Sequence, residues 1–76
     1  MSDTLTFGEK AVGLTFNPGN NPEVDFCKRK FAEVIDQMNA LRTASADPEV
    51  KRMASVAITD AQTAQMWAVK AITWKS

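Results

Sequence analysis

The sequence predicts an all-α fold, an antiparallel helical hairpin, from a helix-start signal that occurs twice and an apolar stripe that follows each copy. The signal reads Asn21-Pro22-Glu23-Val24 and Asp47-Pro48-Glu49-Val50. Asparagine and aspartate accept backbone N–H groups as helix N-caps, and proline suits the first helical position. Glutamate suits the positive end of the helix dipole. The two copies therefore mark two helix starts.

The segment before the first signal carries weaker signals. Thr6 and Glu9 have the spacing of a capping box, and Gly13 can supply the left-handed residue that ends a helix. We expect one or two helical turns over residues 7–12 and an extended stretch over residues 14–18. The chain is expected to form one domain (1–76), with an N-terminal segment (1–21), a first helix (about 22–43) and a second helix (about 48–74).

Each long helix carries an apolar stripe at alternating steps of three and four residues. The first stripe contains mostly large side chains: Val24, Cys27, Phe31, Val34, Met38 and Leu41. The second is almost all alanine: Val50, Ala54, Ala57, Ala61, Ala64, Ala68 and Ala71. Large residues opposite alanines let two antiparallel helices approach closely, with Ala44-Ser45-Ala46 as the connection. The stripes therefore predict that the hairpin closes along these residues.

Further apolar residues on the second helix predict a homo-oligomer. A chain of 76 residues has a small core, and its single cysteine cannot form an internal disulfide. Apolar side chains on more than one face of a helix favour burial between subunits. The residues beside the alanine stripe are Val56, Ile58, Met66, Trp67, Val69, Ile72 and Trp74. We expect the second helix to provide most of the contact between subunits.

Composition excludes several classes of function. Nine basic residues balance nine acidic ones, so no overall positive field favours long nucleic acids. The sequence has no histidine, the commonest general base, and lacks the ligands of a transition-metal site. We expect no enzymatic activity, no metal and no cofactor. The single Cys27 is expected to be a buried free thiol in a reducing compartment. We also expect a soluble protein, since no apolar run approaches the roughly 20 residues that span a bilayer and the start, residues 1–3, lacks a secretion signal.

One basic run, Lys28-Arg29-Lys30, lies in the second turn of the first helix, downstream of Phe16. Successive helical residues point about 100° apart, so the run by itself is typical of a solvated basic face. An aromatic ring that stacks on a base beside a cation that meets phosphate would instead bind a small nucleotide. Trp67 and Trp74 are similarly read as interface anchors, with base stacking as the alternative. We expect Thr59, Gln62 and Thr63 to form hydrogen bonds at a subunit interface, with direct contact to a ligand as the alternative.

Three segments, in their order and spacing, resemble the small phage anti-CBASS proteins that sequester cyclic oligonucleotide signals. These proteins are related to a hairpin region of Thoeris anti-defence sponges, and the resemblance covers nearly the whole chain. The segments are Gly13-Leu14-Thr15-Phe16-Asn17-Pro18, then Val24 to Asp36 with Cys27-Lys28 and Ala32-Glu33-Val34-Ile35-Asp36, and finally Ala57-Ile58-Thr59 with Gln62-Thr63 and Met66 to Ala71.

The resemblance implies a compact helical hexamer that binds cyclic dinucleotides between subunits without cutting them. Some members also hold cyclic trinucleotides at separate sites. In the family, an aromatic near the chain start stacks on a base and an early lysine of the first long helix meets phosphate; Phe16 and Lys28 match these positions. The family's aromatic is often tyrosine, which this chain lacks. Further ligand-binding candidates by position are Thr15 and Asn17 on the loop and the basic residues Arg52 and Lys70.

Two functions remain open at this stage. The first is an anti-CBASS sponge in the host cell cytoplasm that removes cyclic oligonucleotides before they activate an effector, with no long nucleic acid and no membrane as partner. The alternative is a helical protein–protein interaction module that acts through Trp67 and Trp74 without a nucleotide. A nuclease or phosphodiesterase is disfavoured by the missing base and metal ligands.

Overall fold

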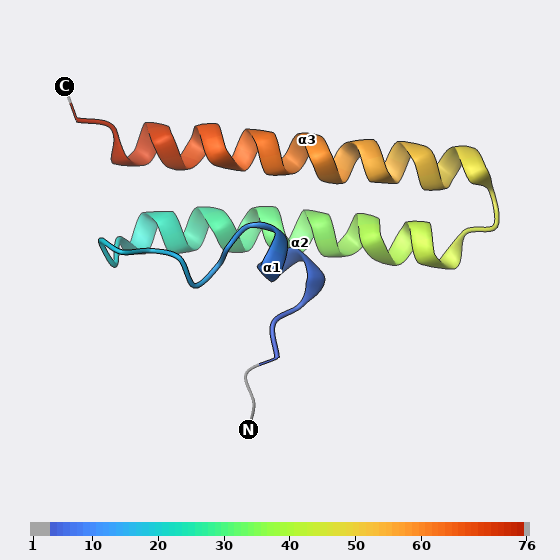
Figure 1. The fold of residues 1–76 in the computed structure, drawn as a ribbon, viewed down its shortest axis with the longest axis horizontal. Helices are drawn as coiled ribbons and strands as arrows, with labels where there is room; N and C mark the ends of the chain where they lie inside the picture. The colour runs from blue at the N-terminus through green and yellow to red at the C-terminus, as the bar shows by residue number, and fades with distance from the viewer. Residues whose placement is uncertain (1–3, 76) are drawn as a thin grey trace.

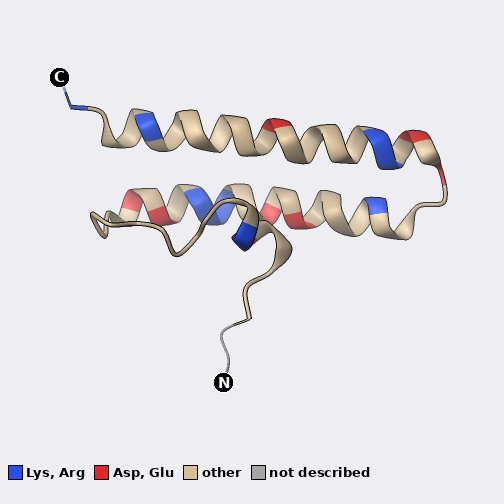
Figure 2. Ribbon diagram, in the orientation of Figure 1, with Lys and Arg blue, Asp and Glu red and all other residues tan. Residues whose placement is uncertain are grey.

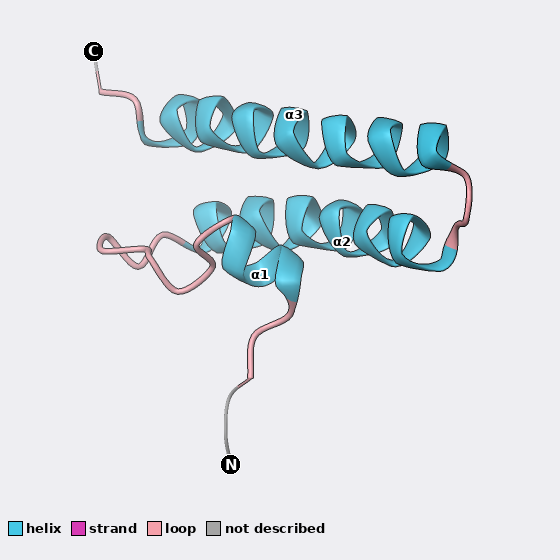
Figure 3. Cartoon of the chain, turned by 45° about the vertical axis from the view of Figure 1, so that its right-hand side comes forward, coloured by secondary structure: helices cyan, strands magenta, loops and turns pink. Residues whose placement is uncertain are grey.

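Residues 4–75 are described by a computed structural model, and they form three helices and no strand (Figure 3). The helices are α1 (Phe7–Ala11), α2 (Pro22–Ala44) and α3 (Pro48–Thr73). Helices α2 and α3 run antiparallel, and α1 packs against α2 (Figure 1). The predicted all-α hairpin is confirmed. The start of the chain, residues 1–3, on which the expected lack of a secretion signal rests, lies outside the described residues.

The protein is a flat slab with principal-axis extents of 46 × 36 × 12 Å. A single α-helix with its side chains is about 10–12 Å across, so the slab is one layer of helices thick. Such a layer leaves both broad faces open to solvent in a single chain. Among the described residues, no helix combines the length and the apolarity required to cross a bilayer.

Both predicted helix-start signals are confirmed as N-caps. The Asn21 side chain accepts a hydrogen bond from the backbone N–H of Glu23 at 2.8 Å. The Asp47 side chain accepts the corresponding bond from Glu49 at 2.9 Å. In addition, the Asp47 backbone N–H donates to Ser45 Oγ at 3.0 Å, which closes the tight connection between the two helices. Ala44 is the last residue of α2 and not part of the connection, so the connection begins one residue later than predicted.

Helix α1 is fixed to α2 through Asp36. The predicted capping box is present, since Thr6 Oγ1 accepts from the Glu9 backbone N–H and the Thr6 N–H donates to Glu9 Oε1. Asp36 Oδ1 accepts a 2.7 Å bond from the Gly8 N–H, and its Oδ2 accepts a 2.7 Å bond from Thr6 Oγ1. Gly8 packs so closely that an added Cβ would lie 2.2 Å from the Ala32 carbonyl oxygen. Asp36 therefore anchors α1 to α2.

The core lies where the N-terminal segment, α2 and α3 meet. Ile35 is the largest fully buried side chain among the described residues. The buried apolar cluster consists of Val12, Leu14, Ala32, Ile35 and Ile58. Two of its members come from the N-terminal segment, so this segment is part of the folded unit and completes the core of the hairpin.

The buried face of α2 agrees only in part with the predicted apolar stripe. Val24 is buried as predicted, and the other buried positions are Lys28, Ala32 and Ile35. The predicted Val34 and Leu41 are instead exposed. The difference arises because α2 packs against both α3 and the N-terminal segment, so the buried face is set by two neighbours and not by one facing helix.

Helix α3 shows the same displacement of its stripe. Ala54 is buried as predicted, but Ile58 and Gln65 are the other buried residues, whereas the predicted Ala64 and Ala71 are exposed. Burying an isoleucine removes more apolar area from water than burying an alanine, which favours this register. The buried face of α3 therefore contains Ile58, which the sequence pattern assigned to the flank, and the polar Gln65, which the pattern did not predict to be buried.

The loop between α1 and α2 is more tightly turned than predicted. Gly13 has the expected positive φ of 61°, and the Phe16 N–H donates to the Gly13 carbonyl oxygen at 2.9 Å. Residues 12–15 consequently form turns, and the extended stretch predicted over 14–18 is wrong for its first part. A second turn is closed by the Asn20 N–H, which donates to the Asn17 carbonyl oxygen at 2.9 Å. The loop therefore holds its residues in defined positions over the start of α2.

Candidate functional site

The basic run of α2 separates into three different environments. Arg29 forms an ion pair with Asp25 at 2.8 Å, and the hydrogen bond within this exposed pair raises the pKa of Arg29. The Lys30 ammonium lies 4.3 Å from the centroid of the Phe26 ring. Lys28 turns inward and is buried. The three side chains thus fan out as the helical spacing predicts, and Lys28 alone of the three enters the packed region.

Lys28 is a buried cation without a carboxylate partner. Its side chain is 4% exposed, and its ammonium donates hydrogen bonds to the carbonyl oxygens of Gly13 (2.9 Å) and Phe16. No ion pair within residues 4–75 includes it. Charged groups are rarely buried unless they are paired, because desolvation is costly. A lysine ammonium has three donors, so two carbonyls leave one donor and the net charge uncompensated by an anion.

Phe16 presents its ring to solvent at the same place. Phe16 is 73% exposed, and the Lys28 ammonium lies 5.6 Å from the centroid of its ring. A cavity of about 610 Å³ is lined by both residues together with the C-terminal end of α3, where Val69, Ile72 and Trp74 contribute. This volume is within the range of about 300–1,000 Å³ that small-molecule sites occupy. The structure thereby brings the two leading sequence-predicted site residues together.

A smaller cavity of about 430 Å³ is also lined by Phe16. It shares Phe16, Lys28 and Val69 with the larger cavity, and its wall also includes Gln65. Gln65 is a site-lining residue that the sequence reasoning missed. The signal that could have found it is a glutamine placed one helical turn after Ala61 on the inner stripe, where the pattern otherwise calls for an apolar residue.

The two predicted loop residues have different surroundings. Asn17 lines the larger cavity, but its amide binds the chain itself: Nδ2 donates to the Asn21 carbonyl oxygen at 2.9 Å and Oδ1 accepts from the Asn21 N–H at 3.2 Å. Thr15 is exposed and lines a third cavity, of about 810 Å³, beside Glu9 and Arg29, and Asn17 also contributes to that cavity. Asn17 therefore adjoins the cavity of Lys28, whereas Thr15 lines none of the cavities that Lys28 lines.

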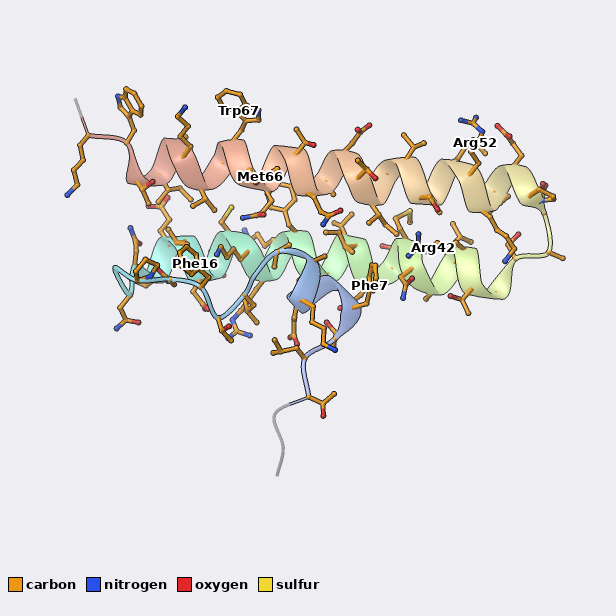
Figure 4. The ribbon with its side chains drawn as sticks, viewed as in Figure 1. Phe7, Phe16, Arg42, Arg52, Met66 and Trp67 are labelled. Carbon is orange, nitrogen blue, oxygen red and sulfur yellow. The ribbon has the colours of Figure 1, made fainter. Side chains whose placement is uncertain are left out.

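Neither of the two predicted basic residues of α3 lines the cavities of Lys28. Arg52 is near the connection between α2 and α3, at the opposite end of the hairpin from Phe16 (Figure 4), and it binds Glu49 through its Nε at 3.0 Å. That hydrogen bond raises the pKa of Arg52. The Lys70 ammonium lies 5.1 Å from the Trp67 ring and 5.8 Å from the Trp74 ring. The structure of one chain therefore brings neither residue to Lys28.

Charge is spread over the hairpin instead of gathering on one face (Figure 2). Basic and acidic segments alternate along α2 and α3, in line with the equal numbers of both signs in the sequence. A long polyanion would need an extended basic surface. The positive charge of Lys28, held between two cavities, suits a small anion.

These features define a capped helical hairpin whose N-terminal loop closes over a buried lysine. The chain belongs to the Acb2/Tad1 hairpin domain family, whose family model matches residues 9–73. The matched region begins within α1 and includes the loop, Lys28, all of α2 and all of α3. No curated protein and no solved structure matched the chain. The predicted membership in the family of anti-CBASS and Thoeris anti-defence sponges is thereby confirmed.

Proposed function

We propose that this protein binds and sequesters cyclic oligonucleotide second messengers, with cyclic dinucleotides as the principal ligands and cyclic trinucleotides as further ones. It holds these signals without cleaving them and so prevents CBASS-type effectors from responding in the cytoplasm of an infected host cell. Membership in the Acb2/Tad1 hairpin domain family supports an anti-defence sponge. The choice of ligand is supported by the chemistry around Lys28.

The observation that carries the proposal is the buried, anion-free ammonium of Lys28 beside the exposed ring of Phe16. A phosphate oxygen would take the remaining donor of Lys28 and neutralise its charge, and a charge-assisted hydrogen bond contributes about 1.5–3 kcal/mol. A base stacked on Phe16 would contribute about 1–3 kcal/mol. A ligand with both a base and a phosphate can use the two residues at once.

A homo-oligomer, which we assign as a hexamer, would complete the site. Several contacts of this size are needed for nanomolar affinity, which corresponds to about −12 kcal/mol. One chain supplies a single such lysine and leaves both faces of a one-layer slab uncovered. Trp67 on α3 and Trp74 directly after it are 65% and 67% exposed. Their burial between subunits would bring several loops and lysines around one cyclic ligand.

Calorimetry with a panel of cyclic di- and trinucleotides tests the proposed function. We expect tight binding of at least one cyclic dinucleotide by the purified protein. The bound ligand, released by denaturation, should have an unchanged mass. A linear product would place the protein among enzymes, and failure of the whole panel would reject the sponge function.

Exposure of Trp67 and Trp74 also supports the alternative, a protein–protein interaction module without a nucleotide. Large exposed aromatic residues are frequent anchors of interfaces. This function leaves the unpaired charge of Lys28 without a role, which is why we rank it second. A protein captured from host lysate, together with no binding across the nucleotide panel, would favour it.

A further inference from the structure

Gln65 combines burial with an unused hydrogen-bonding capacity. The residue as a whole is 5% exposed on the inner face of α3, and its side chain makes no hydrogen bond to any of the described residues 4–75. The neighbouring Gln62 contrasts with it, because Gln62 Nε2 donates to the Ala11 carbonyl oxygen. No buried side-chain nitrogen or oxygen atom of the described residues lacks a hydrogen-bond partner, so the unbonded amide of Gln65 keeps contact with solvent. A polar group in this position is free to bind a ligand that enters the cavity that Gln65 lines.

The location of Gln65 identifies that cavity. Gln65 lines the cavity of about 430 Å³ together with Phe16 and Lys28. These three side chains come from the loop, α2 and α3, and they differ in chemistry: an aromatic face, a cation and a neutral amide. They therefore suit three different parts of one ligand.

Because the amide has both donors and an acceptor, it fits a nucleobase edge better than a phosphate. Phosphate oxygens only accept hydrogen bonds, so they would use the Gln65 nitrogen and be repelled by its oxygen. The edges of nucleobases place donors and acceptors next to each other and pair with both ends of an amide. Phe16 would stack on the face of a base, and because every base has such a face, stacking alone does not distinguish between bases.

We propose that Gln65 is the residue that determines base specificity in this site, by hydrogen bonding to the edge of the base that stacks on Phe16. This inference rests on the proposed function and deepens it. Phe16 and Lys28 then provide affinity for any cyclic nucleotide with a base and a phosphate, and Gln65 decides which base is preferred. The same ligand would bind the Gln65 amide and the Lys28 ammonium together.

The test compares Gln65→Leu with the unaltered protein against cyclic dinucleotides that carry adenine, guanine or uracil. Leucine removes both hydrogen-bonding ends at similar size, and Gln65→Met serves as a second apolar replacement. Gln37→Leu is the matched control, since Gln37 is exposed on α2 and lines no described cavity. Calorimetry gives the affinities, and thermal unfolding without ligand shows whether each variant folds.

We expect Gln65→Leu to bind the preferred ligand about tenfold or more weakly and to reduce the affinity differences between bases, because a bidentate base contact discriminates by about this factor. Its unfolding temperature should be similar, because leucine has a similar size and the Gln65 amide makes no hydrogen bond within the described residues. Unchanged affinity, or an equal loss for every base, would overturn the inference. Should the unaltered protein bind none of the panel, the proposed function itself would fail. Binding by that protein with base preferences intact in Gln65→Leu would overturn the Gln65 assignment alone.

Discussion

The Lys28 ammonium donates a hydrogen bond to the carbonyl oxygen of Phe16 and lies 5.6 Å from the centroid of the Phe16 ring. A single side chain from α2 thus holds the backbone of the loop and adjoins the ring that the loop presents. Both residues line the same two cavities. In the proposed site, this pair would couple phosphate binding to base stacking.

Phe16→Leu should weaken binding of the preferred cyclic dinucleotide by about 1–3 kcal/mol, since the stacking surface is lost. Stability should hardly change, because the ring is largely exposed. Phe26→Leu is the matched control: Phe26 is also exposed and also lies beside a lysine, Lys30, but it lines none of the described cavities. Calorimetry measures both variants. Equal affinities for Phe16→Leu and Phe26→Leu would remove Phe16 from the site.

Replacing Lys28 by methionine should weaken ligand binding and also make it less sensitive to salt. The cation is the ionic contact of the proposed site, and ionic contacts weaken as salt increases. Titrations at low and high salt give the slope for each protein. Lys30→Met is the control, since the Lys30 ammonium lies over the Phe26 ring. A salt dependence in Lys28→Met as steep as in the unaltered protein would show that phosphate is bound elsewhere.

Gly8→Ala should displace α1 and destabilise the fold by about 1–3 kcal/mol, the usual cost of overpacking. The new Cβ would lie 2.2 Å from the Ala32 carbonyl oxygen, which belongs to the backbone of α2 and cannot move aside easily. Gly19→Ala is the matched control, because no atom lies within 4 Å of a Cβ at that position. Thermal unfolding of both variants provides the measurement, and equal unfolding temperatures would contradict the close packing of α1.

Arg52 should keep the Glu49 carboxylate ionised to lower pH than an isolated glutamate. The hydrogen bond from Arg52 lowers the pKa of Glu49. A lowered folded-state pKa contributes stability above the unfolded pKa, and that contribution is lost as the pH falls through the folded value. The effect is small for so exposed a pair. In Arg52→Gln, an NMR titration should show the Glu49 midpoint raised, whereas Arg29→Gln should leave it unchanged; a midpoint unaffected by the loss of Arg52 would refute the interaction in solution.

Trp67→Glu should reduce the size of the assembly if α3 forms the proposed contact between subunits. The Trp67 ring projects from α3 on the side away from α2 (Figure 4), and a buried carboxylate without a partner disfavours an interface. Sedimentation at micromolar concentration measures the size. Gln37→Glu, which adds the same charge on α2, is the control. An unchanged oligomer in Trp67→Glu would exclude this part of α3 as the contact, and a monomer in the unaltered protein would exclude the hexamer.

Features that depend on residues close together in the sequence were predictable. The caps at Asn21 and Asp47 and the capping box of Thr6 and Glu9 each involve a bond across two or three residues. Their geometry follows from local backbone preferences, so the residue types alone indicate it. The pairing of Phe16 with Lys28 was predicted from a family resemblance, and the structure brings the two residues together, whereas local spacing by itself left a solvated basic face as the alternative.

The sequence by itself determined where the helices begin and that two of them form a hairpin. Only the tertiary structure decided which side chains turn inward. Lys28 is buried because loop carbonyls reach its ammonium, and Asp36 holds α1 because Gly8 packs against α2. Gln65 faces the same cavity as Lys28 across the hairpin. The physical reason is that hydrophobic periodicity identifies buried positions only where the residues are apolar. A polar residue becomes internal only when distant segments of the fold supply its hydrogen-bonding partners or a cavity for a ligand.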